Sequence, residues 1–210
     1  MSLQEWIMLF TEQIKETPPL EWIAVAASVA EVLLAWRNNV LLYPAGIIST
    51  ALFIYILFNA GLYAEAVLSV YYFVMSVYGW VHWLRKKNEP PLAISYTTRK
   101  EWQIATGIIV ISMALFYSII ELYLHKYNNT YIALWDAFVS ATAWAGMWLL
   151  ARRKIENWVV LNVSNLFAIP LLLYKKLPLT SCLTLFLFIV AIFGYLEWKK
   201  LYRAAQPRAF

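Results

Sequence analysis

YGWVHW at 78–83 and FGYLEW at 193–198 decide the fold, because they end two apolar segments of the same design. A shift of the chain by 115 positions superposes the two stretches and aligns further identical residues. The identical pairs are Arg37 with Arg152, Ser49 with Ser164, Leu57 with Leu172, Leu62 with Leu177, Leu68 with Leu183, Gly79 with Gly194 and Trp83 with Trp198. Internal repeats in apolar chains are typical of transporters, whose substrate site lies between the repeats. The repeat therefore predicts a transporter.

The composition of the chain indicates that it lies in a lipid bilayer. Hydrophobic residues make up 62% of the 210 residues and charged residues 14%, and the mean hydropathy is +0.61. Spanning helices need roughly 20 apolar residues each, since backbone groups must be satisfied internally in lipid. Seven such runs are predicted, at 20–36, 40–59, 62–84, 101–124, 131–151, 156–174 and 178–199.

The repeat sets the order of these spans as three, one and three. Spans one to three match spans five to seven, and the unmatched fourth span returns the second copy to the orientation of the first. We therefore expect an all-α integral membrane protein with two parallel three-helix bundles. The expected divisions are an N-terminal segment at 1–19, a first repeat at 20–84, a basic loop with the linker helix at 85–125, a second repeat at 131–199 and a tail at 200–210.

The basic residues predict the orientation in the membrane. If the spans alternate, four of the seventeen Lys and Arg side chains lie on the side of the N-terminus and thirteen on the other. The excess of basic residues on cytoplasmic loops places the N-terminus outside and the C-terminus in the cytoplasm. The net charge of +5 then reflects topology and needs no nucleic-acid partner. No removable signal peptide is expected, and residues 1–16 form a weakly amphipathic stretch that either lies flat on the bilayer or is a mobile tail.

Polar and aromatic side chains recur at helical spacing within the later spans and predict the inward faces. Aromatic faces combined with amides and hydroxyls suit a flat, polar, uncharged or cationic ring. Those assigned to substrate are Ser69, Tyr72, Trp144, Trp158, Asn162, Asn165 and Thr184. Trp80, Trp83 and Trp198 fit either an inward face or a belt at the membrane surface.

Glu31 is a further candidate, since an ionisable group within a span is costly unless it faces a cavity or a partner. It contacts either the substrate or a nearby cation such as Arg37. Glu65 and Asp136 lie near helix starts, where the helix dipole favours carboxylates, and structural roles are expected for them.

Other chemistry has little support in the sequence. Cys182 is the single cysteine, His82 and His125 have no ligand spacing around them, and no phosphate-binding glycine loop is present. We expect no metal, no cofactor, no catalytic residue and no direct coupling to ATP.

Two long stretches resemble the PnuC family of vitamin transporters. The first half of that family is similar to residues 20–83, LEWIAVAASVAEVLLAWRNNVLLYPAGIISTALFIYILFNAGLYAEAVLSVYYFVMSVYGWVHW. The second half is similar to ENWVVLNVSNLFAIPLLLYKKL at 156–177 and AIFGYLEW at 191–198. The resemblance implies a 3+1+3 fold like that of SWEET-type transporters, a homotrimer, and facilitated diffusion of nicotinamide riboside across the bacterial inner membrane. It also implies that a cytoplasmic kinase traps the vitamin by phosphorylation.

The chain departs from the family pattern at several inward positions. Leu161 stands where the family has a second Trp, Ser69 where many nicotinamide riboside carriers have Gln, and Thr184 where an aromatic is usual, whereas Asn165 fits. Lys175-Lys176-Leu177-Pro178 also replaces a Lys-Gly-Leu-Tyr pattern. Thiamine, carried by relatives of the same fold, is therefore the alternative substrate. The rival class is a seven-helix ligand-binding receptor, which the short loops and short tail disfavour.

Overall fold

Eight helices form the part of the chain that the computed structural model describes, residues 2–84, 93–119 and 130–206. Seven of them are long and apolar enough to cross a membrane. The helices are α1 (Leu3–Glu16), α2 (Pro19–Trp36), α3 (Leu42–Asn59), α4 (Tyr63–Leu84), α5 (Arg99–Ile119), α6 (Thr130–Ala151), α7 (Asn157–Tyr174) and α8 (Pro178–Ala205). The seven predicted spans are confirmed. The predicted fourth span ran to 124, and its last residues lie outside the described ranges. The last helix continues through Ala205, where a tail was expected from residue 200.

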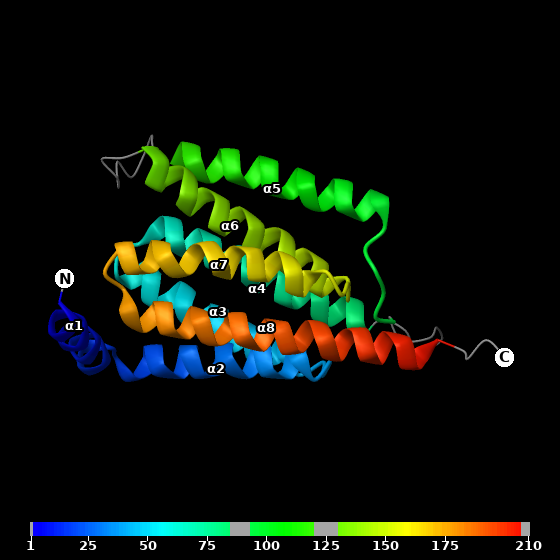
Figure 1. Cartoon of the computed structure of the whole chain (residues 1–210), viewed down its shortest axis with the longest axis horizontal. Coiled ribbons are helices and arrows are strands. Elements are labelled where there is room, and N and C mark those ends of the chain that lie inside the picture. Colours follow the sequence, from blue (N-terminus) through cyan, green and yellow to red (C-terminus); the bar gives the residue numbers. More distant parts are fainter. Residues whose placement is uncertain (1, 85–92, 120–129, 207–210) are drawn as a thin grey trace.

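The spans pack as two groups of three with a separate helix beside the second group (Figure 1). Helix α3 packs between α2 and α4, and α7 packs between α6 and α8, while α5 lies along α6. Corresponding helices of the two groups run in the same direction (Figure 1). Contacts of α4 with α6 and of α2 with α8 join the groups. This is the parallel 3+1+3 order that the sequence repeat predicts.

Structural details recur at the 115-residue offset of the repeat. The Ser49 hydroxyl donates to the carbonyl of Ala24 at 2.9 Å, and the Ser164 hydroxyl donates to that of Val139 at 2.7 Å. Each bond ties the second helix of a group to the first. Left-handed backbone also recurs, in the pair Asn38 and Arg153 and in the pair Gly61 and Lys176. The two groups therefore share turns and helix contacts as well as sequence.

A glycine lets two helices approach closely at the same place in each group. A Cβ added at Gly79 would lie 2.3 Å from the ring of Tyr43, and one added at Gly194 would lie 2.6 Å from the ring of Trp158. Tyr43 and Trp158 are themselves equivalent across the repeat. Each ring therefore fills the space that a missing side chain leaves on the neighbouring helix.

The groups are joined by reciprocal contacts at one end of the bundle, which we call the tryptophan end after Trp83 and Trp198. The indole of Trp83 donates to the carbonyl of Ala151 at 3.2 Å, and that of Trp198 donates to the carbonyl of Ala35 at 2.9 Å. Trp83 is 7% exposed and Trp198 is fully buried. These two tryptophans are therefore core residues, whereas Trp80 is 37% exposed.

The left-handed residues Asn38 and Arg153 meet at this same end. The Nε of Arg153 donates to the Oδ1 of Asn38 at 2.9 Å, and its guanidinium lies 4.3 Å from the centre of the Trp83 ring. Burial lowers the pKa of the Arg153 guanidinium from its ordinary value, yet an arginine stays charged in proteins.

The segment before α5 is fixed to the turn between α6 and α7. Glu156 accepts from the backbone and hydroxyl of Thr97 at 2.9 and 2.7 Å. Glu101 pairs with Lys154 at 2.9 Å and with Arg152 at 3.2 Å. These ion pairs hold the start of the linker helix at the tryptophan end.

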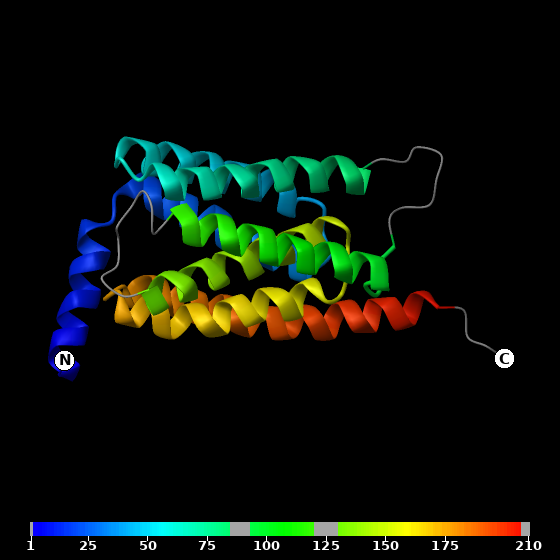
Figure 2. The same cartoon turned by 90° about the horizontal axis from the view of Figure 1, so that it is seen from above.

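Helix α1 lies across the opposite end of the bundle, roughly perpendicular to the spans (Figure 2). Ser2 and Glu5 form a reciprocal capping box at its start. Gln13 contacts the α7–α8 turn twice, donating to the carbonyl of Lys176 at 2.9 Å and accepting from the N–H of Leu179 at 3.2 Å. Of the two expectations for residues 1–16, a flat-lying segment fits this direction better than a free tail.

Candidate functional site

A cavity of about 360 Å³ lies between the two helix groups. Both groups contribute to its wall, α2, α3 and α4 on one side and α6, α7 and α8 on the other. The lining residues are Ser28, Glu31, Val32, Ala35, Ser49, Thr50, Phe53, Ser69, Tyr72, Ala143, Met147, Leu150, Trp158, Leu161, Asn165, Leu187 and Ala191. The volume falls within the range of small-molecule sites, which is roughly 300–1,000 Å³.

Trp158 is the aromatic wall that the second group contributes to this cavity. Its side chain is 2% exposed and rests on Gly194 of α8. The ring of Trp198 meets it edge-on, with 5.6 Å between centres and an interplanar angle of 89°. The buried Nε1 of Trp158 has no hydrogen-bond partner among the described residues. The ring is thus fixed in place and still has a donor to offer.

Polar side chains line the cavity from α2, α3, α4 and α7. Asn165 of α7 donates to the side chain of Asn162 at 3.5 Å, a long bond that leaves the Asn165 carbonyl oxygen open to a ligand. Ser69 and Tyr72 line the opposite wall from α4, and Glu31 lines it from α2. The cavity therefore combines an aromatic face, amide and hydroxyl groups and one carboxylate.

Five of the eight predicted site residues come together in this cavity, namely Glu31, Ser69, Tyr72, Trp158 and Asn165. The helical period explains which residues of α7 face the cavity. Trp158, Leu161 and Asn165 follow steps of three and four and share a face, whereas Asn162 lies one residue beyond Leu161 and is turned by about 100°.

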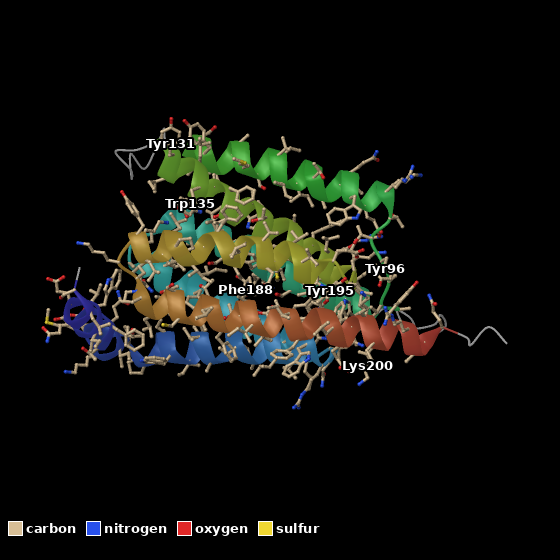
Figure 3. The ribbon with its side chains drawn as sticks, viewed as in Figure 1. Tyr96, Tyr131, Trp135, Phe188, Tyr195 and Lys200 are labelled. Atoms are coloured by element: carbon tan, nitrogen blue, oxygen red, sulfur yellow. The ribbon has the colours of Figure 1, made fainter. Side chains whose placement is uncertain are left out.

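Asn162 instead lines a groove on the outer side of α7 and α8, beside Trp158, Phe188 and Tyr195. Phe188 and Tyr195 both project from α8 in Figure 3. Trp158 separates this groove from the central cavity, since it lines both. Asn162 is linked to the cavity wall by its hydrogen bond with Asn165.

Trp144 and Thr184 are not among the residues that line the cavity. Trp144 stacks on Tyr71 with 3.9 Å between ring centres and meets Phe116 edge-on at 4.6 Å. This arrangement packs α4, α5 and α6 together. The hydroxyl of Thr184 donates to the carbonyl of Thr180 on its own helix at 2.9 Å. Both side chains thus have local packing roles in this conformation.

No residue of α3 was assigned to the substrate from the sequence, although Ser49, Thr50 and Phe53 of this helix line the cavity. This helix is apolar around its whole circumference, so no inward stripe is apparent in its sequence. The 115-residue offset carried the missing signal, because it pairs Thr50 with Asn165. A cavity-facing residue in one group indicates a cavity-facing position in the other.

Asp136 and Glu65 are the two carboxylates predicted near helix starts, and Asp136 does not line the cavity. Asp136 forms an ion pair with Lys175 at 2.8 Å, in line with the structural role expected for it. The side chain of Glu65 lies outside the described part of the chain. Within that part, no three His, Cys, Asp or Glu residues group as metal ligands would.

Comparisons with known proteins place this arrangement among vitamin transporters. A family model described as nicotinamide mononucleotide transporter matches residues 18–200. The nicotinamide riboside transporters PnuC of Escherichia coli K12 and of Shigella flexneri are each 23% identical over 215 residues, covering 90% of this chain and 90% of theirs. The crystal structure of a vitamin B3 transporter PnuC superposes with a TM-score of 0.68 at 19% identity, over 97% of this chain and 91% of that one.

Proposed function

Because this chain belongs to the nicotinamide mononucleotide transporter family, we propose that it carries nicotinamide riboside across the bacterial inner membrane by facilitated diffusion. The family is one of transporters, which favours transport over an enzyme or a seven-helix receptor. The observation that carries the proposal is the cavity between the two helix groups, with an aromatic wall and polar groups facing it. The names of the similar bacterial proteins suggest the substrate.

The proposed roles follow from the positions around the cavity. The indole of Trp158 stacks on the vitamin ring, and Asn165 hydrogen-bonds its amide edge, with Asn162 holding Asn165. Ser69 and Tyr72 bond polar groups from the other wall, and Glu31 favours a positively charged ring. Trp144 and Thr184 support the surrounding helices.

Alternating access requires the helix groups to move against each other around the site. The two indole–carbonyl bonds at the tryptophan end and the contact between Asn38 and Arg153 close one side of the cavity. Rocking of the groups must break these contacts. With no energy input the carrier only equilibrates its substrate, so a cytoplasmic kinase that phosphorylates the vitamin draws net uptake forward.

The proposal includes an orientation and an assembly. The basic residues at the tryptophan end support a cytoplasmic position for that end and an external position for the N-terminus. The resemblance to the PnuC family supports a homotrimer. Cysteine labelling from each side of intact cells, and the mass of the purified protein in detergent, test these two points.

Reconstituted vesicles test the transport proposal. Labelled nicotinamide riboside should exchange across the membrane without ATP and without an ion gradient. Trp158→Ala and Asn165→Ala should each weaken apparent affinity by about tenfold, since each removes a contact worth roughly 1–2 kcal/mol. Trp22→Ala serves as the control, because Trp22 is 41% exposed and lies outside the cavity lining. Exchange that both cavity variants leave unchanged would refute the site, and binding without any exchange would favour a receptor.

Thiamine is the second candidate, favoured by two side chains of the cavity wall. Ser69 and Leu161 both line the cavity. Leu161 departs from the usual family pattern, and Ser69 departs from the Gln of many nicotinamide riboside carriers. A ligand that binds the folded state raises its apparent stability. The thermal shifts of the purified protein with nicotinamide riboside, thiamine and riboflavin therefore discriminate between these substrates.

A further inference from the structure

Among the described residues, Glu31 contributes the one carboxyl group on the cavity wall. It is the one Asp, Glu, Lys or Arg side chain among the described residues that line the cavity. Within the described ranges its carboxylate forms no ion pair with Arg37 or any other cation. An ionisable group in a spanning helix is costly unless a partner or a cavity accommodates it. The Glu31 carboxyl group therefore faces the cavity, where a positively charged ligand could pair with it.

Gly46 determines where this carboxylate lies. A Cβ added at Gly46 would lie 2.5 Å from Oε1 of Glu31, 2.6 Å from Cδ and 3.0 Å from Oε2. The carboxylate therefore rests on the backbone of α3, in the space that a side chain at this position would occupy. The neighbouring hydroxyl of Thr50 donates its proton to the backbone carbonyl of Gly46, at 2.7 Å.

The second helix group makes the same contact with the partners exchanged. The 115-residue offset pairs Glu31 with Gly146 and Gly46 with Leu161. A Cβ added at Gly146 would lie 2.6 Å from Cδ2 of Leu161. In the first group the large side chain belongs to the first helix and is ionisable, whereas in the second it belongs to the second helix and is apolar. Among the described lining residues, the carboxyl group therefore lies on the α2–α3 wall alone.

We propose that Glu31 and Gly46 together select a positively charged heteroaromatic ring and fix its orientation, with the charge toward α2 and α3 and the ring against Trp158. This inference rests on the proposed function and adds the orientation of the ring in the cavity and Gly46 as a positioning residue. A carboxylate attracts a cationic ring strongly where water is largely excluded. The apolar Leu161 leaves the opposite wall without an equivalent charge, so the reversed orientation lacks this attraction.

A pair of ligands with the same shape and different charge tests the proposal. Nicotinamide riboside has a cationic ring, and benzamide riboside, in which a carbon replaces the ring nitrogen, is neutral. Competition against labelled nicotinamide riboside in vesicles gives the ratio of the two affinities. The wild type should prefer the cation by an order of magnitude or more. Glu31→Gln should remove most of that preference through weaker binding of the cation alone.

Two further variants separate positioning from general damage to the helix contact. Gly46→Ala should lower the cation preference several-fold, because it displaces the carboxylate without removing it. Gly146→Ala disturbs the equivalent uncharged contact and should weaken both ligands equally. Glu31→Asp retains the charge and should keep part of the preference. Size-exclusion profiles and melting temperatures establish that each variant is folded.

The outcomes distinguish this inference from the proposed function. A wild type that takes up nicotinamide riboside and binds both ligands equally would overturn the charge selection and leave the transport proposal intact. A folded Glu31→Gln protein with an unchanged preference would also overturn the charge selection. A wild type that binds neither ligand would refute both proposals.

Discussion

Single glycines set the shape of the cavity, because a side chain of the neighbouring helix occupies the space beside each of them. The indole of Trp158 rests where Gly194 has no side chain, and the carboxylate of Glu31 does the same at Gly46. Such positions are sensitive to the smallest enlargement, since packed interiors leave little room for an added methyl group. The chemistry of the wall therefore depends on residues that contribute no functional group themselves.

Gly194→Ala should move the Trp158 ring and lower substrate affinity together with stability. An added Cβ would lie 2.6 Å from the ring, and overpacking of this kind costs about 1–3 kcal/mol. Thermal unfolding with and without ligand measures both effects. The control is Gly107→Ala on α5, where no atom lies within 4 Å of the added Cβ. Equal behaviour of the two variants would show that the close approach of α7 and α8 has no role in binding.

At the scale of the elements, Gln13 is the one α1 side chain that forms hydrogen bonds with the spans among the described residues. Gln13 forms two hydrogen bonds with the α7–α8 turn, while Leu3, Ile7 and Met8 on the same helix are more than half exposed. The exposed apolar face suits the membrane surface, across which the helix would lie.

Gln13→Ala should loosen α1 without unfolding the bundle. Each lost hydrogen bond contributes about 0.5–1.5 kcal/mol, and α1 contacts the spans mainly through α8. Limited proteolysis should cleave the first eighteen residues faster in vesicles, while the melting temperature of the spans changes little. Gln4→Ala, at an exposed position of the same helix, is the control. Unchanged cleavage would mean that apolar contacts alone hold α1.

The membrane-spanning helices were predictable because their signal in the sequence is local. The residues of the cavity were predictable only in part. Span limits follow from apolar length and from breakers such as Arg37-Asn38-Asn39, and the repeat follows from an offset that any comparison of the halves detects. The rotation of each helix about its axis depends on the helices packed against it, which the sequence does not show. Asn162 and Trp144 therefore shared a helical stripe with cavity residues in the sequence, but they do not line the cavity. The attachment of α1 joins residues 163 and 166 positions apart, which no local pattern reveals.

At the scale of the whole molecule, the tryptophan end joins the two helix groups. Trp83 and Trp198 each donate to a carbonyl at the end of the first helix of the opposite group. Reciprocal bonds of this kind hold both groups at once, so their strength sets the balance between closed and open arrangements of that end.

Trp83→Phe and Trp198→Phe should each shift this balance toward the open arrangement. Phenylalanine keeps much of the aromatic packing and removes the indole N–H, at a cost to the closed state of about 1 kcal/mol per bond. In a Cys182→Ser background, a cysteine introduced at Ser28 in the cavity wall should react several-fold faster with a polar maleimide applied from the tryptophan end. Trp102→Phe on α5 is the control, since Trp102 is 38% exposed. Equal labelling rates in all variants would exclude these bonds as a closure.

The meeting of Asn38 and Arg153 has one more consequence. These residues occupy the same place in the two halves, and they touch each other. In an assembly of two identical halves, a residue on the twofold axis faces its own copy, so it must be compatible with itself. Two arginines would repel there. Joining the halves in one polypeptide removes that restriction, because each side of the axis can then change alone. Here the Arg153 cation donates a hydrogen bond to the amide oxygen of Asn38.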